Sequence, residues 1–225
     1  MRLSCTLMLL AFLLGCNDLA SEYATPCTLP EDIDQVTVKL SSTLTQDQEE
    51  IDYCQVPLAI DGPSLSFNIE LYDFDITSEE KMIDALTRLK LVVNSQKFKA
   101  RVLAHEYNNN KSFADNEGLS NEEIYNIIMD GAETLNEVVD NEIDLNITLY
   151  YEKSSTSGYT YPHEQGIWIN DYYYASNSPA KVANTVFHEW THKLGFSHDF
   201  YNTAKRPYSV PYAVGSIIQE LVEEL

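Results

Sequence analysis

Three histidines and one glutamate in the C-terminal part of the chain have the spacing of a metal-dependent catalytic site. His188 and His192 are four residues apart, so on a helix both imidazoles lie on one face and can bind the same ion. Glu189 lies too far round the helix to be a good ligand, but it can reach a water on the metal. Gly195 can adopt the left-handed conformation that ends a helix, and this turn would bring His198 back as a third nitrogen ligand.

This ligand set indicates hydrolysis assisted by zinc. Three neutral histidines that leave a position for water are typical of catalytic Zn2+, whereas structural zinc sites usually have four protein ligands and are rich in cysteine. The spacing therefore predicts that zinc lowers the pKa of its bound water and that Glu189 takes the proton as this water attacks the substrate. Tyr212 is the predicted hydroxyl group near the reacting atoms. Tyr208 is a second candidate, and a structural role for both stays open.

Two alternative interpretations of these residues remain open at the level of the sequence. In the first, Glu220 on a later helix supplies the third ligand in a thermolysin-like arrangement, and Gly195 and His198 are coincidental. In the second, the chain is a non-catalytic surface lipoprotein that binds zinc for stability or adhesion. The presence of Glu189 favours catalysis, because a structural site needs no general base.

The N-terminal residues have the features of an export signal. Residues 1–15 contain a positive charge followed by a short apolar core, and the run Leu13-Leu14-Gly15-Cys16 resembles a bacterial lipobox. The resemblance implies cleavage before Cys16, lipidation of its thiol and a tether to a membrane outside the cytoplasm, at the outer membrane or the cell surface. An ordinary secretory signal is the alternative. Cys27 and Cys54 are predicted to form a disulfide in that oxidising compartment, unless one of them binds the metal as an inhibitory thiolate.

The composition limits the classes of protein to which the chain can belong. A length of 225 residues, with 44% apolar and 22% charged residues, predicts one globular domain. This domain is placed at residues 62–225, after a linker and N-terminal extension at 16–61. The net charge of −21 opposes binding to nucleic-acid phosphates. The expected partners are a protein or peptide substrate and, through the lipid anchor, a membrane, and the protein is expected to be a monomer.

Strand and helix patterns alternate along the domain, which predicts an α+β fold. Apolar residues alternate with polar ones, or form a short apolar run, in the segments expected to be strands: 35–40, 65–71, 98–104, 143–151 and 166–170.

Three helices are expected between and after these strands. The first follows a capping box formed by Thr77 and Glu80, and the second follows one formed by Ser120 and Glu123 and is expected to extend to Val138. The third carries the histidines. Ser178 or Asn177 is its predicted cap, with Pro179 in its first turn.

Residues 188–199, His-Glu-x-x-His-x-x-Gly-x-x-His-Asp, resemble the zinc motif of the metzincin peptidases, with Asp after the third histidine as in the adamalysin-like branch. The resemblance covers roughly residues 62–225, but only the motif is specific. It implies a twisted mixed sheet backed by helices, an active-site helix and a C-terminal helix. It also implies that strand 166–170 is the edge strand that aligns an extended peptide substrate.

The chain departs from the metzincin pattern in one respect. Metzincins place a methionine in a tight turn beneath the metal, and no methionine follows His198. Residues 208–213 are the expected counterpart, with Pro211 in place of methionine and a Ser-Val-x-x-Tyr pattern similar to that of astacin-like turns. A rigid proline could form the floor under the histidines.

Overall fold

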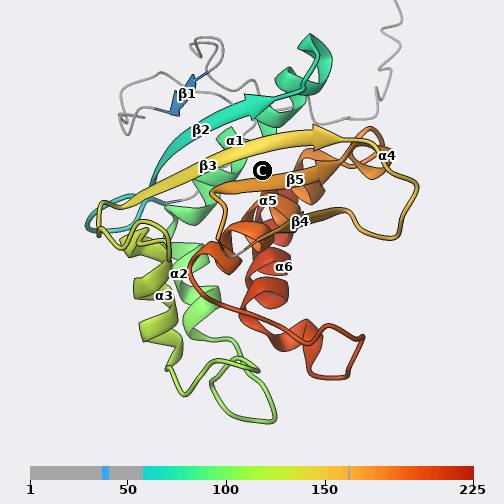
Figure 1. The fold of residues 1–225 in the computed structure, drawn as a ribbon. Helices are drawn as coiled ribbons and strands as arrows, with labels where there is room; N and C mark the ends of the chain where they lie inside the picture. Colours follow the sequence, from blue (N-terminus) through green and yellow to red (C-terminus); the bar gives the residue numbers. More distant parts are fainter. Residues whose placement is uncertain (1–36, 41–57, 162) are drawn as a thin grey trace, which may run out of the picture.

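The computed structural model describes residues 37–40, 58–161 and 163–225, which mix strands and helices along the chain (Figure 1). The predicted α+β class is therefore confirmed. The predicted signal at 1–15, the lipidation site Cys16 and the cysteines Cys27 and Cys54 lie outside the described residues. The elements are β1 (Thr37–Leu40), β2 (Ser66–Tyr72), α1 (Ile76–Val93), α2 (Gln96–Leu103), α3 (Asn121–Asp130), β3 (Glu142–Tyr150), β4 (Gly158–Thr160), β5 (Gly166–Asn170), α4 (Asp171–Tyr174), α5 (Pro179–Lys193), the 3-10 helix η1 (Arg206–Tyr208) and α6 (Val210–Glu223).

The strands form one open mixed sheet in the order β1-β2-β3-β5-β4. β2, β3 and β5 are parallel to one another, whereas β1 and β4 pair antiparallel at the two edges. The expectation that residues 166–170 form the edge strand is wrong, because β5 lies between β3 and β4. β4 was not predicted, because its three residues follow a Ser-rich and Thr-rich run and are too few to show an alternating pattern.

Helices α1, α5 and α6 lie on the same side of the sheet (Figure 1). On the side of the sheet that faces these helices, the side chains of β2 and β3 are buried: Phe67, Ile69, Ile143, Leu145 and Ile147. They form the core together with apolar residues of the helices. α5 packs between the sheet and α6, and Gly215 permits the close approach, since a Cβ there would lie 2.8 Å from Asn184 Oδ1. Among the described helices, none combines the length and the apolar character that crossing a bilayer requires.

The segment predicted as a strand at 98–104 is instead the helix α2. Ser95 caps this helix by accepting a hydrogen bond from the Phe98 N–H at 3.1 Å. Phe98 and Val102 are buried, whereas Ala100 and Ala104 are exposed. An alternating pattern also includes residues four apart, such as Phe98 and Val102, so it fits one face of a helix as well as a strand, and this is the face that is buried.

The two capping boxes differ in how well the sequence predicts them. Ser120 and Glu123 form the predicted box at the start of α3. α1 begins after Asp75, which forms a capping box with Ser78, so the predicted box at Thr77 and Glu80 is wrong.

The predicted extension of the second helix to Val138 is also wrong. α3 ends at Asp130 because Gly131 adopts the left-handed conformation, with φ 71°. Leu135 and Val138 lie beyond this end and are exposed. Only a glycine fits at this position, because the Cβ of any other residue would lie 2.5 Å from the Glu142 carbonyl oxygen.

Candidate metal centre

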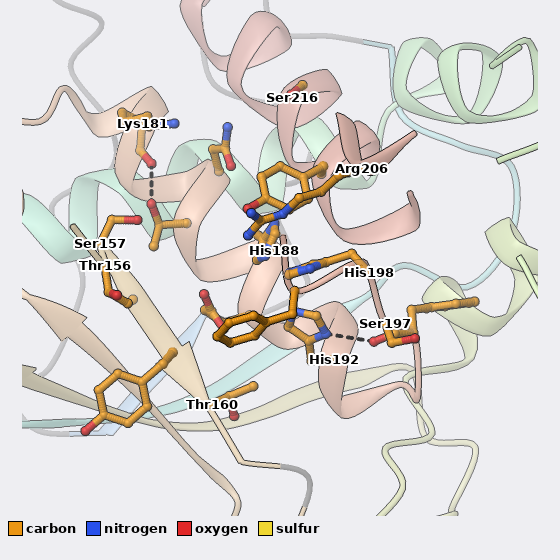
Figure 2. A pocket seen from close by; sticks show the side chains of 18 of the residues that line it. Thr156, Ser157, Thr160, Lys181, His188, His192, Ser197, His198, Arg206 and Ser216 are labelled. Carbon is orange, nitrogen blue, oxygen red and sulfur yellow. Dashed lines mark hydrogen bonds between the residues drawn. The ribbon is translucent and has the colours of Figure 1, made fainter. Parts of the chain in front are cut away.

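Helix α5 carries the first two histidines and the glutamate of the motif. It begins as predicted after Ser178, whose hydroxyl accepts a hydrogen bond from the Lys181 N–H at 3.2 Å, and Pro179 is in its first turn. Beyond the end of α5, Gly195 has φ 94°, a conformation that side chains oppose. The chain turns at this glycine and returns His198 to the face that carries His188 (Figure 2).

The three histidines lie together. Each histidine offers one ring nitrogen, and these three nitrogens all lie within 4.8 Å of one another. The ring centroids are 4.9 to 5.2 Å apart in the three pairs formed by His188, His192 and His198. Among the described residues, these three form the one group of histidine, cysteine and acidic side chains with metal-ligand spacing. They could hold a metal ion.

Backbone carbonyls orient two of the rings. Nδ1 of His192 lies 2.7 Å from the carbonyl oxygen of Phe196, and Nδ1 of His198 lies 3.0 Å from that of Asp199. Because a carbonyl can only accept, each Nδ1 carries the proton and each Nε2 keeps its lone pair for a metal. The Asp199 side chain anchors this loop by accepting a hydrogen bond from Thr203 and by forming an ion pair with Lys205.

The histidines are held in the form that binds metals. Burial lowers the pKa of each imidazole: that of His188 falls well below its ordinary value, that of His192 falls to about 4, and that of His198 is also lowered. At His188 the neighbouring histidines reinforce the effect of burial, because protonated rings would repel one another. The three rings are therefore neutral at pH 7.

Glu189 is buried beside the histidines and is only 7% exposed. Burial raises the pKa of its carboxyl to about 8, and the nearby Lys193 ammonium acts in the opposite direction. A bound cation would also lower this pKa by attraction, so that the carboxylate form is available as a base near neutral pH.

The start of α6 packs against the histidines. The Tyr212 ring centroid lies 4.6 Å from that of His188 and 4.8 Å from that of His198, and burial raises the pKa of the Tyr212 hydroxyl. Pro211 is buried in the first turn of α6, so residues 208–213 are a helix start and not the tight turn that was expected. Tyr208 contacts His105 and Tyr107 instead, and of the two predicted tyrosines only Tyr212 lies at the site.

Glu220 does not lie with the histidines. It is an exposed residue on α6 and forms an ion pair with Arg101 of α2. The group with metal-ligand spacing contains His198 and not Glu220.

A cleft of about 880 Å³ opens over the histidines. The edge strand β4 lines one side of it with Gly158, Tyr159 and Thr160, and α5, α6 and η1 line the other (Figure 2). β4 lies close to α5, since a Cβ on Gly158 would be 3.0 Å from Thr185 Cγ2. The site thus combines three neutral imidazoles, a buried carboxyl and an open edge strand.

A buried glutamate supports α5 from behind the site, and no sequence pattern predicted it. The Trp190 indole donates a hydrogen bond to Glu133 Oε1 at 2.8 Å, and Glu133 Oε2 is buried without a hydrogen-bond partner among the described residues. Burial raises the pKa of the Glu133 carboxyl to about 7. Glu133 lies in the loop after α3, outside any predicted motif, so only the tertiary contact with Trp190 identifies it.

This raised pKa predicts a pH-dependent stability. The folded state holds the Glu133 proton more tightly than the unfolded state does. The contribution of this proton to the free energy of unfolding is therefore fully present below about pH 4.5 and is lost as the pH rises through about 7. Relative to Glu133→Gln, we expect the wild-type protein to lose about 2–3 kcal/mol of unfolding free energy between pH 5 and pH 8. Urea unfolding of both proteins at the two pH values measures this difference. Parallel pH profiles would contradict it.

The turn at Gly195 predicts a separate effect on metal affinity. Gly195→Ala is expected to cost about 1–2 kcal/mol of stability through the backbone conformation alone, because its Cβ would make only an ordinary contact, 3.5 Å from Thr134 Cγ2. Gly118→Ala is the matched control, since Gly118 has φ 86° and nothing near its Cβ. Both variants should unfold at lower urea, but only Gly195→Ala should weaken zinc binding, measured by competition with a chelator. Equal zinc affinities would refute the role of this turn.

Comparisons with known protein families, with curated proteins and with solved structures found no match. The assignment of this centre therefore rests on its own residues.

Proposed function

We propose that this protein is a zinc-dependent endopeptidase. The observation that carries the proposal is the grouping of His188, His192 and His198 with the buried carboxyl of Glu189 on the floor of an open cleft. Three neutral imidazoles suit zinc, and three protein ligands leave a position free for water, which is the arrangement of catalytic sites. A buried acid beside the ligands that is not itself in the ligand group suits the role of a general base.

The residues of the chain divide the chemistry between them. Zinc, when bound, supplies a Lewis acid that lowers the pKa of water and polarises the scissile carbonyl. Glu189 accepts a proton from the attacking water and returns it to the nitrogen of the leaving amine. Tyr212, whose ring contacts His188 and His198, is the candidate hydrogen-bond donor to the oxyanion.

The edge strand β4 supports a peptide as the substrate. Among the described strands, β4 pairs with β5 alone, and its three residues line the cleft, so that its unpaired backbone groups are available to pair with an extended chain. A protein or peptide segment bound in this way would run past the histidines. We therefore assign peptide bonds within extended segments as the substrate class.

The finer assignment to the metzincin type rests on the motif in residues 188–199. It is supported by the glycine turn that returns His198 and by the contacts of Tyr212, at the start of α6, with His188 and His198. The methionine turn has no counterpart at residues 208–213, which begin a helix with Pro211 in its first turn. This difference leaves all three histidines in position. We regard the protein as a divergent metzincin-like peptidase.

The proposal includes a location outside the cytoplasm. A signal at 1–15 and lipidation of Cys16 would tether the domain to a bacterial membrane, and Cys27 and Cys54 would pair in the oxidising compartment. The domain is proposed to act there as a monomer.

Removal and restoration of the metal test the proposal. The purified protein should cleave members of a mixed peptide library, lose this activity after treatment with a zinc chelator, and regain it with one equivalent of zinc. Mass spectrometry of the products measures the cleavage. A protein that binds zinc and cleaves nothing would contradict the proposal and favour a non-catalytic zinc-binding surface lipoprotein.

A further inference from the structure

Part of the cleft has a charge opposite to that of the protein as a whole. The chain has 35 acidic residues against 14 Lys and Arg and a net charge of −21. The residues that line the cleft include two cations, Lys181 and Arg206, and a single acidic residue, Glu189, which lies beside the histidines. Positive charge is therefore concentrated in the cleft of an otherwise acidic molecule.

The two cations come from different elements and line the part of the cleft that runs from His188 toward the start of α5. Lys181 is exposed in the first turn of α5, and Arg206 is half-buried in η1. Asn184 of α5 and Ser216 of α6 also line the cleft. Figure 2 shows Arg206 beside His188, and it shows Lys181 farther along α5, the helix that carries His188.

Neither cation is neutralised by an acidic side chain among the described residues, whose ion pairs use other cations: Arg88, Lys97, Arg101 and Lys205. The Arg206 guanidinium lies over the Tyr212 ring, 4.7 Å from its centroid, and its Nε is buried without a hydrogen-bond partner in the described part of the chain. A guanidinium partly removed from water with no counter-charge is an incomplete ion pair. A ligand anion would complete it.

We propose that this part of the cleft binds a carboxylate of the substrate. The inference rests on the proposed peptidase function and names the substrate class: peptides with an acidic side chain, or a free C-terminal carboxylate, near the scissile bond. Arg206 offers the planar donor pair that matches a carboxylate, and Lys181 adds a second charge.

The position of the cations limits how far this carboxylate lies from the bond that is cut. Arg206 is close enough to the histidines for its charge to lower the pKa of both His188 and His198. Lys181 precedes His188 by two turns of α5, about 10 Å. An extended chain covers that distance in about three residues. The carboxylate is thus within about three residues of the scissile bond.

Binding to a protein that does not turn over tests this site separately from catalysis. Fluorescent peptide pools that carry Glu, Gln or Lys at one position, each as a C-terminal acid and as an amide, would be titrated by anisotropy into zinc-loaded Glu189→Gln protein. The Glu pool should bind about tenfold more tightly than the Gln pool, and the Lys pool most weakly. A preference for the acid over the amide that does not depend on Glu would assign the site to the C-terminal carboxylate.

Variants of the two cations identify the residues responsible. In the Glu189→Gln background, Arg206→Gln and Lys181→Gln should each reduce the preference for a carboxylate, Arg206→Lys should keep part of it, and the exposed Lys181→Glu should shift it toward the Lys pool. Lys111→Gln is the matched control, because Lys111 is exposed and does not line the cleft, and its replacement changes the net charge by the same amount.

Equal affinities of the acidic, neutral and basic pools, including no binding by any of them, would overturn the proposal. So would a preference that survives loss of both cations. Cleavage by the wild-type enzyme without a preference for carboxylates would leave the peptidase function standing. A carboxylate preference without cleavage would leave this site standing and refute that function.

Discussion

Replacement of Glu189 by Gln is expected to lower the rate of peptide hydrolysis by about 10³-fold, within the range that a general acid–base group contributes. The amide has nearly the same shape but cannot accept a proton from water. Because Glu189 lies outside the group of three histidines, the variant should still bind one equivalent of zinc. Initial rates on a cleaved peptide and zinc content by atomic absorption measure the two effects.

The two measurements have to be combined, because loss of zinc would also abolish activity. A Glu189→Gln protein with full zinc content and an unchanged rate would refute the assigned role of this residue. A variant that loses both zinc and activity would make Glu189 part of the metal site and not the base.

Replacement of His198 by Ala is expected to weaken zinc binding by more than about 100-fold, since loss of a group that merely supports a ligand can cost that much. His198 is the ligand that depends on the turn at Gly195, and two imidazoles from α5 would remain. Hydrolysis should fall in parallel at limiting zinc. Competition with a chromophoric chelator gives the affinity.

Glu220→Gln is the matched control for this prediction, because it tests the alternative ligand. Glu220 pairs with Arg101 at an exposed position, so its replacement should leave zinc affinity unchanged. A Glu220→Gln protein that loses zinc, or a His198→Ala protein that keeps it, would favour the thermolysin-like arrangement.

The motif could be predicted from the sequence because its geometry is local. His188 and His192 are related by the helical repeat, and Gly195 has only to adopt one backbone conformation to return His198. The strands with clear alternation, such as β3, could be predicted for the same reason. These features depend on neighbours in the chain.

Features that depend on tertiary contacts could not be predicted. Alternation at 98–104 fitted both a strand and a helix, and the buried face of α2 decided between them. Leu135 and Val138, beyond Gly131, continued the helical spacing, but they are exposed in the described part of the chain. Glu133 lies between α3 and β3 and Arg206 lies in η1, and only the fold brings them to Trp190 and Tyr212.

Hydrolysis of a peptide library in water enriched with 18O tests the central claim most directly. With zinc-loaded wild-type protein, we predict new C-terminal carboxylates that each carry one 18O atom, and none with Glu189→Gln protein of the same zinc content. Products without the label, or no products from wild-type protein fully loaded with zinc, would contradict the assignment of this centre as a hydrolytic site.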